Sequence, residues 1–142
     1  MKNILITGGG GYIGTNLTNT LLSNNYNVTV IDTFWFGNYL KKHNRLKVIK
    51  KDIRDISKKN LNNIDCIIHL ASIANDPAAE LDARLTWDVN VLSTYRLINL
   101  AINQKIKKFI FASSGSVYGI KKEKHVIENL SLEPISEYIN QK

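Results

Sequence analysis

Short apolar runs alternate with longer amphipathic segments along this chain. The apolar runs cover residues 2–7, 28–32, 46–50, 65–71 and 108–113, and several are rich in Ile and Val. Runs of this length, bounded by Gly, Asn, Asp or Lys, are typical of buried strands. We therefore predict five strands.

Helical periodicity lies between these runs. Residues 12–24 carry Ile13, Leu17 and Leu21 at helical spacing, and two asparagines follow as a stop signal. The longest pattern, 78–104, places four apolar residues on one stripe: Leu81, Leu85, Val89 and Leu92. Shorter helices are predicted at 55–61 and from 135 to 142, and segments 33–45 and 115–132 are predicted to be irregular.

Strands that alternate with helices predict a parallel sheet built from right-handed β-α-β units. The expected fold is α/β, a Rossmann-type doubly wound sheet with strand order 3-2-1-4-5, in one domain spanning 1–142. Ligands of such sheets bind beyond the carboxyl ends of the strands, where the strand order reverses. The strand ends are therefore where candidate chemistry is expected.

Composition narrows the class of protein. Apolar residues make up 44% of the 142 residues and charged residues 22%, as in ordinary globular domains. No apolar run approaches a membrane span and no signal-peptide core follows the start, so a cytoplasmic protein without membrane contact is expected. The single cysteine, Cys66, sits in an apolar strand and is predicted to be buried.

The net charge of +7 raises the possibility of nucleic-acid binding. The lysines, however, form small groups scattered over the predicted loops and strand ends, and no nucleic-acid-binding motif accompanies them. We interpret the charge as a solvated lysine-rich surface and expect no nucleic-acid partner.

A glycine loop follows the first predicted strand. Gly8, Gly11 and Gly14 have the spacing in which the first glycine permits a tight turn and the second lets a pyrophosphate approach the backbone. The third lets the helix pack on the sheet, and the helix N-terminus offers N–H groups to phosphates. The context of strand, loop and amphipathic helix predicts a dinucleotide site rather than a plain glycine-rich turn.

Asp32 ends the second predicted strand. A carboxylate at this place can accept hydrogen bonds from a ribose diol, as in NAD sites, and would repel the 2′-phosphate of NADP. No basic residue occurs from 33 to 40. NAD is therefore the expected cofactor, and the alternative is that Asp32 is only a turn residue.

From these residues onward, the chain resembles the extended short-chain dehydrogenase/reductase family, the NAD-dependent nucleotide-sugar epimerases and dehydratases. The matching motifs come in the family's order: TGGGGYIG at 7–14, DIRD at 52–55, HLAS at 69–72, NVLST at 90–94, SSGSVYG at 113–119, and PISEY at 134–138 with Lys142. Ser72 and Ser93 depart from the family pattern, which usually has alanine and glycine there.

The resemblance implies a set of site residues. The expected cofactor contacts are Gly8, Gly11, Tyr12, Ile13, Gly14, Asp32, Asp52, Ile53, Leu70, Ala71, Ser72, Asn90, Tyr138 and Lys142. Of these, Asp52 and Ile53 are expected at the adenine ring, and Asn90 is expected to order the site. The implied catalytic residues are Tyr138, Lys142 and Ser114, and no metal site is expected.

Tyr138 and Lys142 would lie on one face of a helix, since they are four residues apart. A free tyrosine has a pKa of about 10 and is a poor base at neutral pH, but a neighbouring ammonium stabilises the phenolate. Tyr138 could then take a proton from a sugar hydroxyl while Ser114 holds the sugar oxygen. Tyr118 and Lys122 have the same spacing, but Gly119 and the absence of a helical pattern argue against them.

Several alternatives stay open at this stage. Ser114 can be a strand-end turn serine, and His69 is interpreted as a core histidine rather than a catalyst. Asn75 and Asp76 are interpreted as turn residues before a proline. The family's dehydratases carry an acidic pair where this chain has Gly115 and Ser116, which disfavours dehydration.

The resemblance also bears on the extent of the protein. Members of this family are considerably longer and carry a C-terminal substrate domain that binds the nucleotide-sugar. We expect this chain to be the N-terminal portion, inactive by itself, of an epimerase that forms a homodimer at full length. A keto-sugar-nucleotide reductase and a non-catalytic NAD-binding module are the alternatives.

Overall fold

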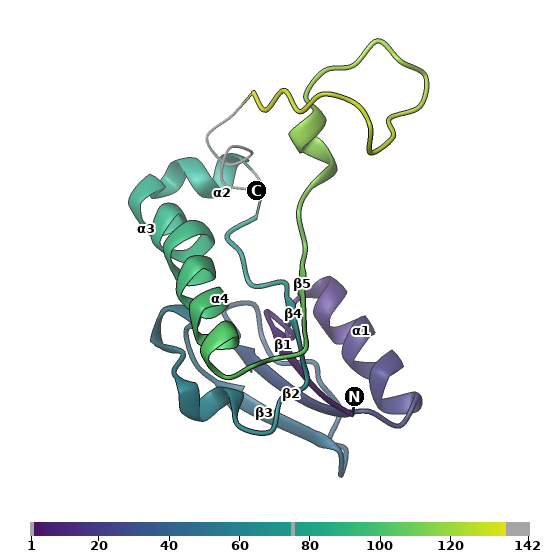
Figure 1. Cartoon of the computed structure of the whole chain (residues 1–142). Helices are drawn as coiled ribbons and strands as arrows, with labels where there is room; N and C mark the ends of the chain where they lie inside the picture. The colour runs from purple at the N-terminus through teal and green to yellow at the C-terminus, as the bar shows by residue number, and fades with distance from the viewer. Residues whose placement is uncertain (1, 75, 136–142) are drawn as a thin grey trace.

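The computed structural model describes residues 2–74 and 76–135. Within this part of the chain, five parallel strands form one sheet in the order β3-β2-β1-β4-β5 (Figure 1). The strands are β1 (Asn3–Thr7), β2 (Asn27–Asp32), β3 (Leu46–Lys50), β4 (Cys66–His69) and β5 (Lys108–Phe111). The predicted fold class and strand order are confirmed, and every strand begins and ends within two residues of the predicted bounds.

Both faces of the central strand β1 are covered, which is why its sequence is continuously apolar. Successive side chains point to opposite faces of a strand. Leu5 accordingly belongs to a core cluster that includes Ile67 and Leu97, whereas Ile4 and Ile6 belong to a second cluster with Leu22. Cys66 is buried in that second cluster, as predicted.

Helix α1 (Tyr12–Ser23) covers one face of the sheet, but its most buried stripe differs from the prediction. The buried positions are Gly14, Thr18 and Leu22, whereas Ile13 is exposed. Gly14 is in the interior because the helix start packs on the glycine loop. Ile13 consequently turns toward the carboxyl ends of the strands.

The prediction of one continuous helix over 78–104 is wrong. The chain forms α2 (Asp76–Leu81), α3 (Ala83–Trp87), one π-helical turn (Asp88–Leu92) and α4 (Ser93–Asn103). Asp82 has an extended conformation and its carboxylate accepts a hydrogen bond from the Leu85 N–H at 2.8 Å. This capping interaction starts a new helix, as aspartate at an N-cap commonly does.

The predicted apolar stripe fails with it. Leu81 is 88% exposed and Leu92 is also exposed, whereas Val89 is buried. The wide π-helical turn shifts the phase, and the buried positions after it are Ser93, Leu97 and Ala101.

The remaining segments are short. The helix predicted over 55–61 is instead two 3₁₀ turns, Ile53–Asp55 and Lys58–Leu61. The segment after β5 contains one 3₁₀ turn, Gly115–Tyr118, and extends away from the sheet (Figure 1). The helix predicted from 135 to 142 lies outside the described residues except at its first position.

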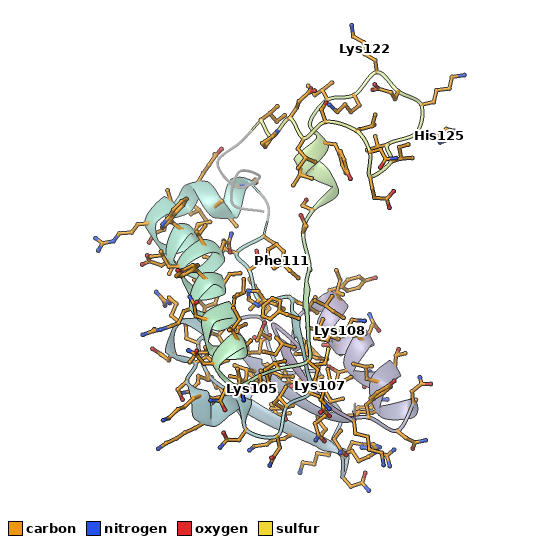
Figure 2. All side chains as sticks on the ribbon, viewed as in Figure 1. Lys105, Lys107, Lys108, Phe111, Lys122 and His125 are labelled. Atoms are coloured by element: carbon orange, nitrogen blue, oxygen red, sulfur yellow. The ribbon has the colours of Figure 1, made fainter. Side chains whose placement is uncertain are left out.

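The lysines lie at separate places on the fold. Lys105, Lys107 and Lys108 lie near the start of β5, whereas Lys122 and His125 lie at the far tip of the extended segment (Figure 2). No helix in residues 2–74 and 76–135 has the length and apolar character needed to cross a bilayer.

Candidate active site

The glycine loop joins β1 to α1 at the carboxyl edge of the sheet. Gly8 has φ +71°, and a Cβ there would lie 2.6 Å from the Ala71 backbone nitrogen, so only glycine fits beside the end of β4. A Cβ on Gly14 would lie 2.6 Å from the Cα of Gly9. At Gly11 the nearest atom to a Cβ would be 3.5 Å away, so this position is open. The first and third glycines thus have the packing roles that their spacing predicts.

The N-terminus of α1 faces the same region. Its N-cap is Gly11, and no side chain caps the helix there. The N–H groups of a first turn have no partner within the helix and carry the positive end of its dipole. This end of α1 can therefore bind an anion such as a phosphate.

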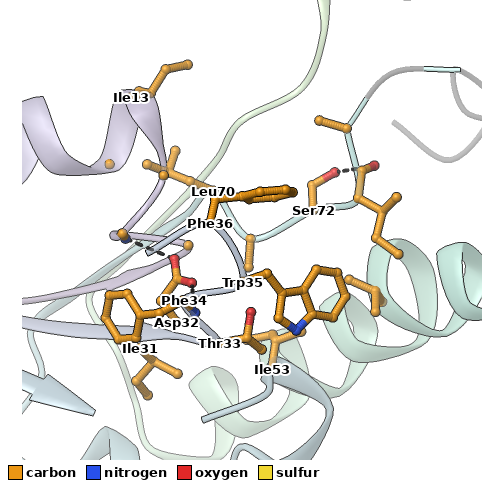
Figure 3. A pocket seen from close by; sticks show the side chains of 18 of the residues that line it. Ile13, Ile31, Asp32, Thr33, Phe34, Trp35, Phe36, Ile53, Leu70 and Ser72 are labelled. Carbon is orange, nitrogen blue, oxygen red and sulfur yellow. Dashed lines mark hydrogen bonds between the residues drawn. The ribbon is translucent and has the colours of Figure 1, made fainter. Parts of the chain in front are cut away.

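Asp32 ties the glycine loop to the end of β2. One carboxylate oxygen accepts a hydrogen bond from the Gly10 N–H at 2.9 Å, and the other accepts one from the Phe34 N–H at 2.7 Å (Figure 3). The turn role that sequence reasoning kept as an alternative is thus real. Each oxygen retains a further lone pair, so the same carboxylate can still accept hydrogen bonds from the two hydroxyl groups of a diol.

A cavity of about 460 Å³ runs along the carboxyl ends of the strands. Its lining includes most of the cofactor contacts expected from the sequence: Gly8, Gly11, Tyr12, Ile13, Gly14, Asp32, Asp52, Ile53, Leu70, Ala71 and Ser72. The topological position is the one at which doubly wound sheets bind ligands. The fold therefore brings together residues that lie between Gly8 and Ser72 in the sequence.

Sequence reasoning did not name several residues of this lining, and four of them bear on ligand binding. Phe34, Trp35 and Phe36 contribute aromatic surface, and the signal was visible as three consecutive aromatic residues that begin two positions after Asp32. Lys51 also lines the cavity, from the end of β3, and its ammonium donates to the Asp55 carbonyl oxygen at 3.2 Å. A search limited to residues 33–40 could not find a basic side chain from a neighbouring strand.

Asp52 follows β3 and caps the 3₁₀ turn Ile53–Asp55. Its carboxylate accepts three hydrogen bonds from Arg54, one from the backbone N–H at 2.8 Å and two from the guanidinium at 3.1 and 2.8 Å. These hydrogen bonds to the Arg54 side chain hold the pKa of the Asp52 carboxyl below its ordinary value. Ile53 is buried next to it and presents an apolar surface to the cavity.

Asn90 lies behind the cavity and does not line it. Its amide oxygen accepts from the Ile73 N–H at 2.9 Å, and its amide nitrogen donates to the Ile73 carbonyl oxygen at 3.1 Å. Ile73 itself lines the cavity. Asn90 is therefore placed to order the loop after β4, and its direct contact with a cofactor stays a prediction.

His69 is a core residue, as the sequence analysis expected. Its ring is buried, with Nδ1 hydrogen-bonded to the Thr7 hydroxyl and Nε2 to the Thr94 hydroxyl at 2.7 Å. Phe109 and Phe111 flank the ring. The imidazole links β1, β4 and α4 and is not among the residues that line the cavity.

The expected catalytic residues are only partly described. The Ser114 hydroxyl accepts from the Ser116 N–H at 3.2 Å and begins the 3₁₀ turn, while the preceding Ser113 lines the cavity. Tyr138 and Lys142 lie outside the described residues. Gly119 has φ +68° directly after Tyr118, so no helix carries Tyr118 and Lys122 together.

Known proteins are similar to this chain in sequence and in fold. A protein of Methanocaldococcus jannaschii named "Putative UDP-glucose 4-epimerase" is 34% identical over 139 residues, which cover 95% of this chain and 46% of that protein. The solved UDP-N-acetylglucosamine 4-epimerase of Methanobrevibacter ruminantium, in complex with UDP-N-acetylmuramic acid, has a TM-score of 0.91 and 32% identity over 99% of this chain and 46% of its own.

A third similar protein was solved with its cofactor. The UDP-glucuronic acid 4-epimerase of Bacillus cereus, in complex with UDP-glucuronic acid and NAD, has a TM-score of 0.90 and 34% identity, covering 99% of this chain and 48% of its own. The chain thus spans less than half the length of the proteins it matches. Residues 4–142 match the NAD dependent epimerase/dehydratase family. This chain belongs to that family, whose cofactor is the NAD expected from the glycine loop and Asp32.

Proposed function

We propose that this chain is the dinucleotide-binding, N-terminal part of an NAD-dependent epimerase that acts on a nucleotide-sugar. The observation that carries the proposal is one cavity lined by the glycine loop, Asp32 and Asp52. In this proposal the α1 N-terminus would bind the pyrophosphate, and the Asp32 carboxylate would accept hydrogen bonds from the adenosine ribose hydroxyls.

The proposed reaction begins at a sugar carbon that bears a hydroxyl group. Bound NAD would supply the acceptor, and afterwards the donor, of a hydride at that carbon. Tyr138, as the proposed base, would take the hydroxyl proton, with the ammonium group of Lys142 stabilising the phenolate, so that a keto-sugar would form. Ser114 hydrogen-bonds the sugar oxygen. Inversion of the carbon would require hydride return to the opposite face of the keto-sugar, and Tyr138 would give the proton back to the oxygen.

The substrate class is proposed from the relatives, which are named for UDP-sugars. A reductase of keto-sugar nucleotides would use the same residues but consume the reduced cofactor.

Because the chain spans less than half the length of its relatives, we expect these 142 residues alone to bind NAD and to show little or no turnover. We further propose that the complete enzyme is a cytoplasmic homodimer. A non-catalytic NAD-binding module is the second candidate. It would be favoured if this chain is not part of a longer protein.

Calorimetric titration of the purified chain with NAD and NADP tests the cofactor assignment. NAD should bind at least about tenfold more tightly than NADP, since the Asp32 carboxylate repels a 2′-phosphate. Asp32→Ala should weaken NAD binding by about 10- to 100-fold and reduce the preference over NADP. Equal affinity of the unaltered chain for both dinucleotides would contradict the role of Asp32, and no binding of either would contradict the proposal.

Turnover of a UDP-hexose by a protein that carries this chain at full length separates the enzyme classes. An epimerase inverts the sugar without net formation of NADH, whereas a reductase consumes NADH in proportion to product. Tyr138→Phe should abolish either activity and leave NAD affinity within a few fold, because the phenol is the proposed base.

A further inference from the structure

A tight turn at the rim of the cavity carries two large aromatic side chains. The Gly37 N–H donates to the Phe34 carbonyl oxygen at 3.2 Å, which closes a four-residue turn with Trp35 and Phe36 at its two central positions. Such positions are usually occupied by Gly, Pro, Asn, Asp or Ser. The turn itself therefore does not explain why two aromatic residues are present.

Both rings are exposed and both line the cavity. Trp35 is 58% exposed and Phe36 is 89% exposed. Figure 3 shows both side chains among those that line the cavity, with the Trp35 ring pointing toward Ile53. Removing apolar rings from water at the rim of a cavity lowers the free energy, so a ligand that covers them is bound more tightly.

Trp35 marks one end of the cavity, and Phe36 follows it directly on the same turn. Trp35 also lines a smaller hollow together with Lys50, Lys51 and Asp52, which places it between the ends of β2 and β3. This is the side of Asp32. The opposite end, at β4 and β5, is lined by Ala71, Ser72, Ala112 and Ser113, none of which offers an aromatic face.

The position of the turn is set by the same carboxylate that ties down the glycine loop. Asp32 accepts from the Phe34 N–H at the first residue of the turn. Phe34 has φ +56° and its ring fills the space next to Gly10. The two exposed rings are thus held on an anchored turn, so little ordering is needed when a ligand arrives.

We propose that Trp35 and Phe36 form an aromatic wall for the adenine ring of the bound dinucleotide, so that adenine recognition relies on ring contact at this wall. The inference rests on the proposed NAD binding. It extends that proposal by naming which half of the dinucleotide the turn contacts. Aromatic rings stack on bases without reading their hydrogen-bonding edges. The nicotinamide half lies at the opposite end and leaves the wall untouched.

Fluorescence distinguishes the two halves of the dinucleotide because the chain has only two tryptophans, Trp35 and Trp87. In the Trp87→Phe variant of the full chain, all tryptophan emission comes from Trp35. NAD and ADP-ribose should both quench or shift this emission, and nicotinamide mononucleotide should leave it unchanged. The Trp35→Phe variant, which retains Trp87, should show no such response.

Affinity measured by calorimetry provides the second readout. Replacing both Trp35 and Phe36 by alanine should weaken NAD and ADP-ribose by the same factor, about 5- to 100-fold. Tyr39→Ala is the matched control, because Tyr39 is 75% exposed in the same segment but does not line the cavity. It should bind both ligands like the unaltered chain, and circular dichroism should show that all variants are folded.

The outcomes separate this inference from the proposed function. If the unaltered chain binds NAD but the double alanine variant binds it equally well, the aromatic wall is wrong and NAD binding stands. A response of Trp35 to nicotinamide mononucleotide but not to ADP-ribose would also overturn the wall. If the unaltered chain binds neither NAD nor ADP-ribose, both proposals fail.

Discussion

The side chain of Asn90 forms two hydrogen bonds with the backbone of Ile73, accepting from its N–H at 2.9 Å and donating to its carbonyl oxygen at 3.1 Å. The two residues are seventeen positions apart. Asn90 is buried on the π-helical turn, whereas Ile73 belongs to the loop that follows β4 and lines the cavity. A helix on one face of the sheet thereby holds a loop of the candidate site in place.

Removal of this pair should lower stability. Asn90→Ala leaves the Ile73 backbone groups without these partners, and we expect unfolding to cost about 1–3 kcal/mol less than in the unaltered chain. Urea unfolding followed by circular dichroism measures the difference. Asn99→Ala is the control: its amide donates to the Tyr95 carbonyl oxygen on the exposed side of α4, so a change within about 0.5 kcal/mol is expected. Equal effects of the two substitutions would contradict the positioning role of Asn90.

Substitution of the loop glycines should affect stability at one position and NAD affinity at another. Gly14→Ala places a methyl group 2.6 Å from the Gly9 Cα, against backbone that cannot yield, and should destabilise the chain by about 1–3 kcal/mol. Gly11→Ala meets no close atom, so its stability should change by less than about 1 kcal/mol while NAD affinity falls at least about tenfold.

Thermal unfolding and calorimetric titration of these variants give the two readouts. Gly115→Ala serves as the control, because a Cβ there has nothing within 4 Å. It should change neither quantity. A Gly11→Ala variant that binds NAD normally would show that the cofactor backbone does not approach α1 as proposed.

The ion pair of Asp52 and Arg54 should make a pH-dependent contribution to stability. Hydrogen bonds from Arg54 lower the pKa of the Asp52 carboxyl from its ordinary 3.8, so the folded state favours the charged form. The contribution is therefore fully present above that unfolded-state value and is lost as the pH falls through the lower folded-state pKa. Because the Arg54 side chain is 40% exposed, solvent screening limits the contribution to about 1 kcal/mol or less.

Urea unfolding of the unaltered chain and of Asp52→Asn, at about pH 6 and about pH 3 without cofactor, measures this contribution. At the higher pH the free energy of unfolding of the unaltered chain should exceed that of Asp52→Asn. This difference between the two chains should be smaller at the lower pH. A difference that grows on acidification would have the wrong sign for a carboxyl with a lowered pKa.

Cys66 should be unreactive in the folded chain. The side chain is buried in the core beside β1, and burial raises the pKa of the thiol by disfavouring the thiolate. A thiol reagent such as Ellman's should therefore label the folded chain far more slowly than the chain in urea. Rapid labelling without denaturant would mean that β4 opens readily.

Much of the architecture follows from local patterns in the sequence. The apolar runs that became β1 to β5 alternate with amphipathic segments, and that alternation predicts a parallel sheet and its strand order. The spacing of Gly8, Gly11 and Gly14 after a strand likewise predicts the site, because the steric demand of a strand-turn-helix junction is local. Asp32 could be located by its distance along the chain from that loop.

Other features depend on contacts between distant segments and have no local signal. The helical period over 78–104 continues through Asp82 and through the π-helical turn, so the breaks arise from the capping by Asp82 and the packing of Val89 and Leu97 on the sheet. Lys51 enters the cavity because β3 lies beside β2, and Asn90 reaches Ile73 because a helix packs behind β4. Period and propensity describe neighbours along the chain, whereas these relationships are set by which elements the folded core places side by side.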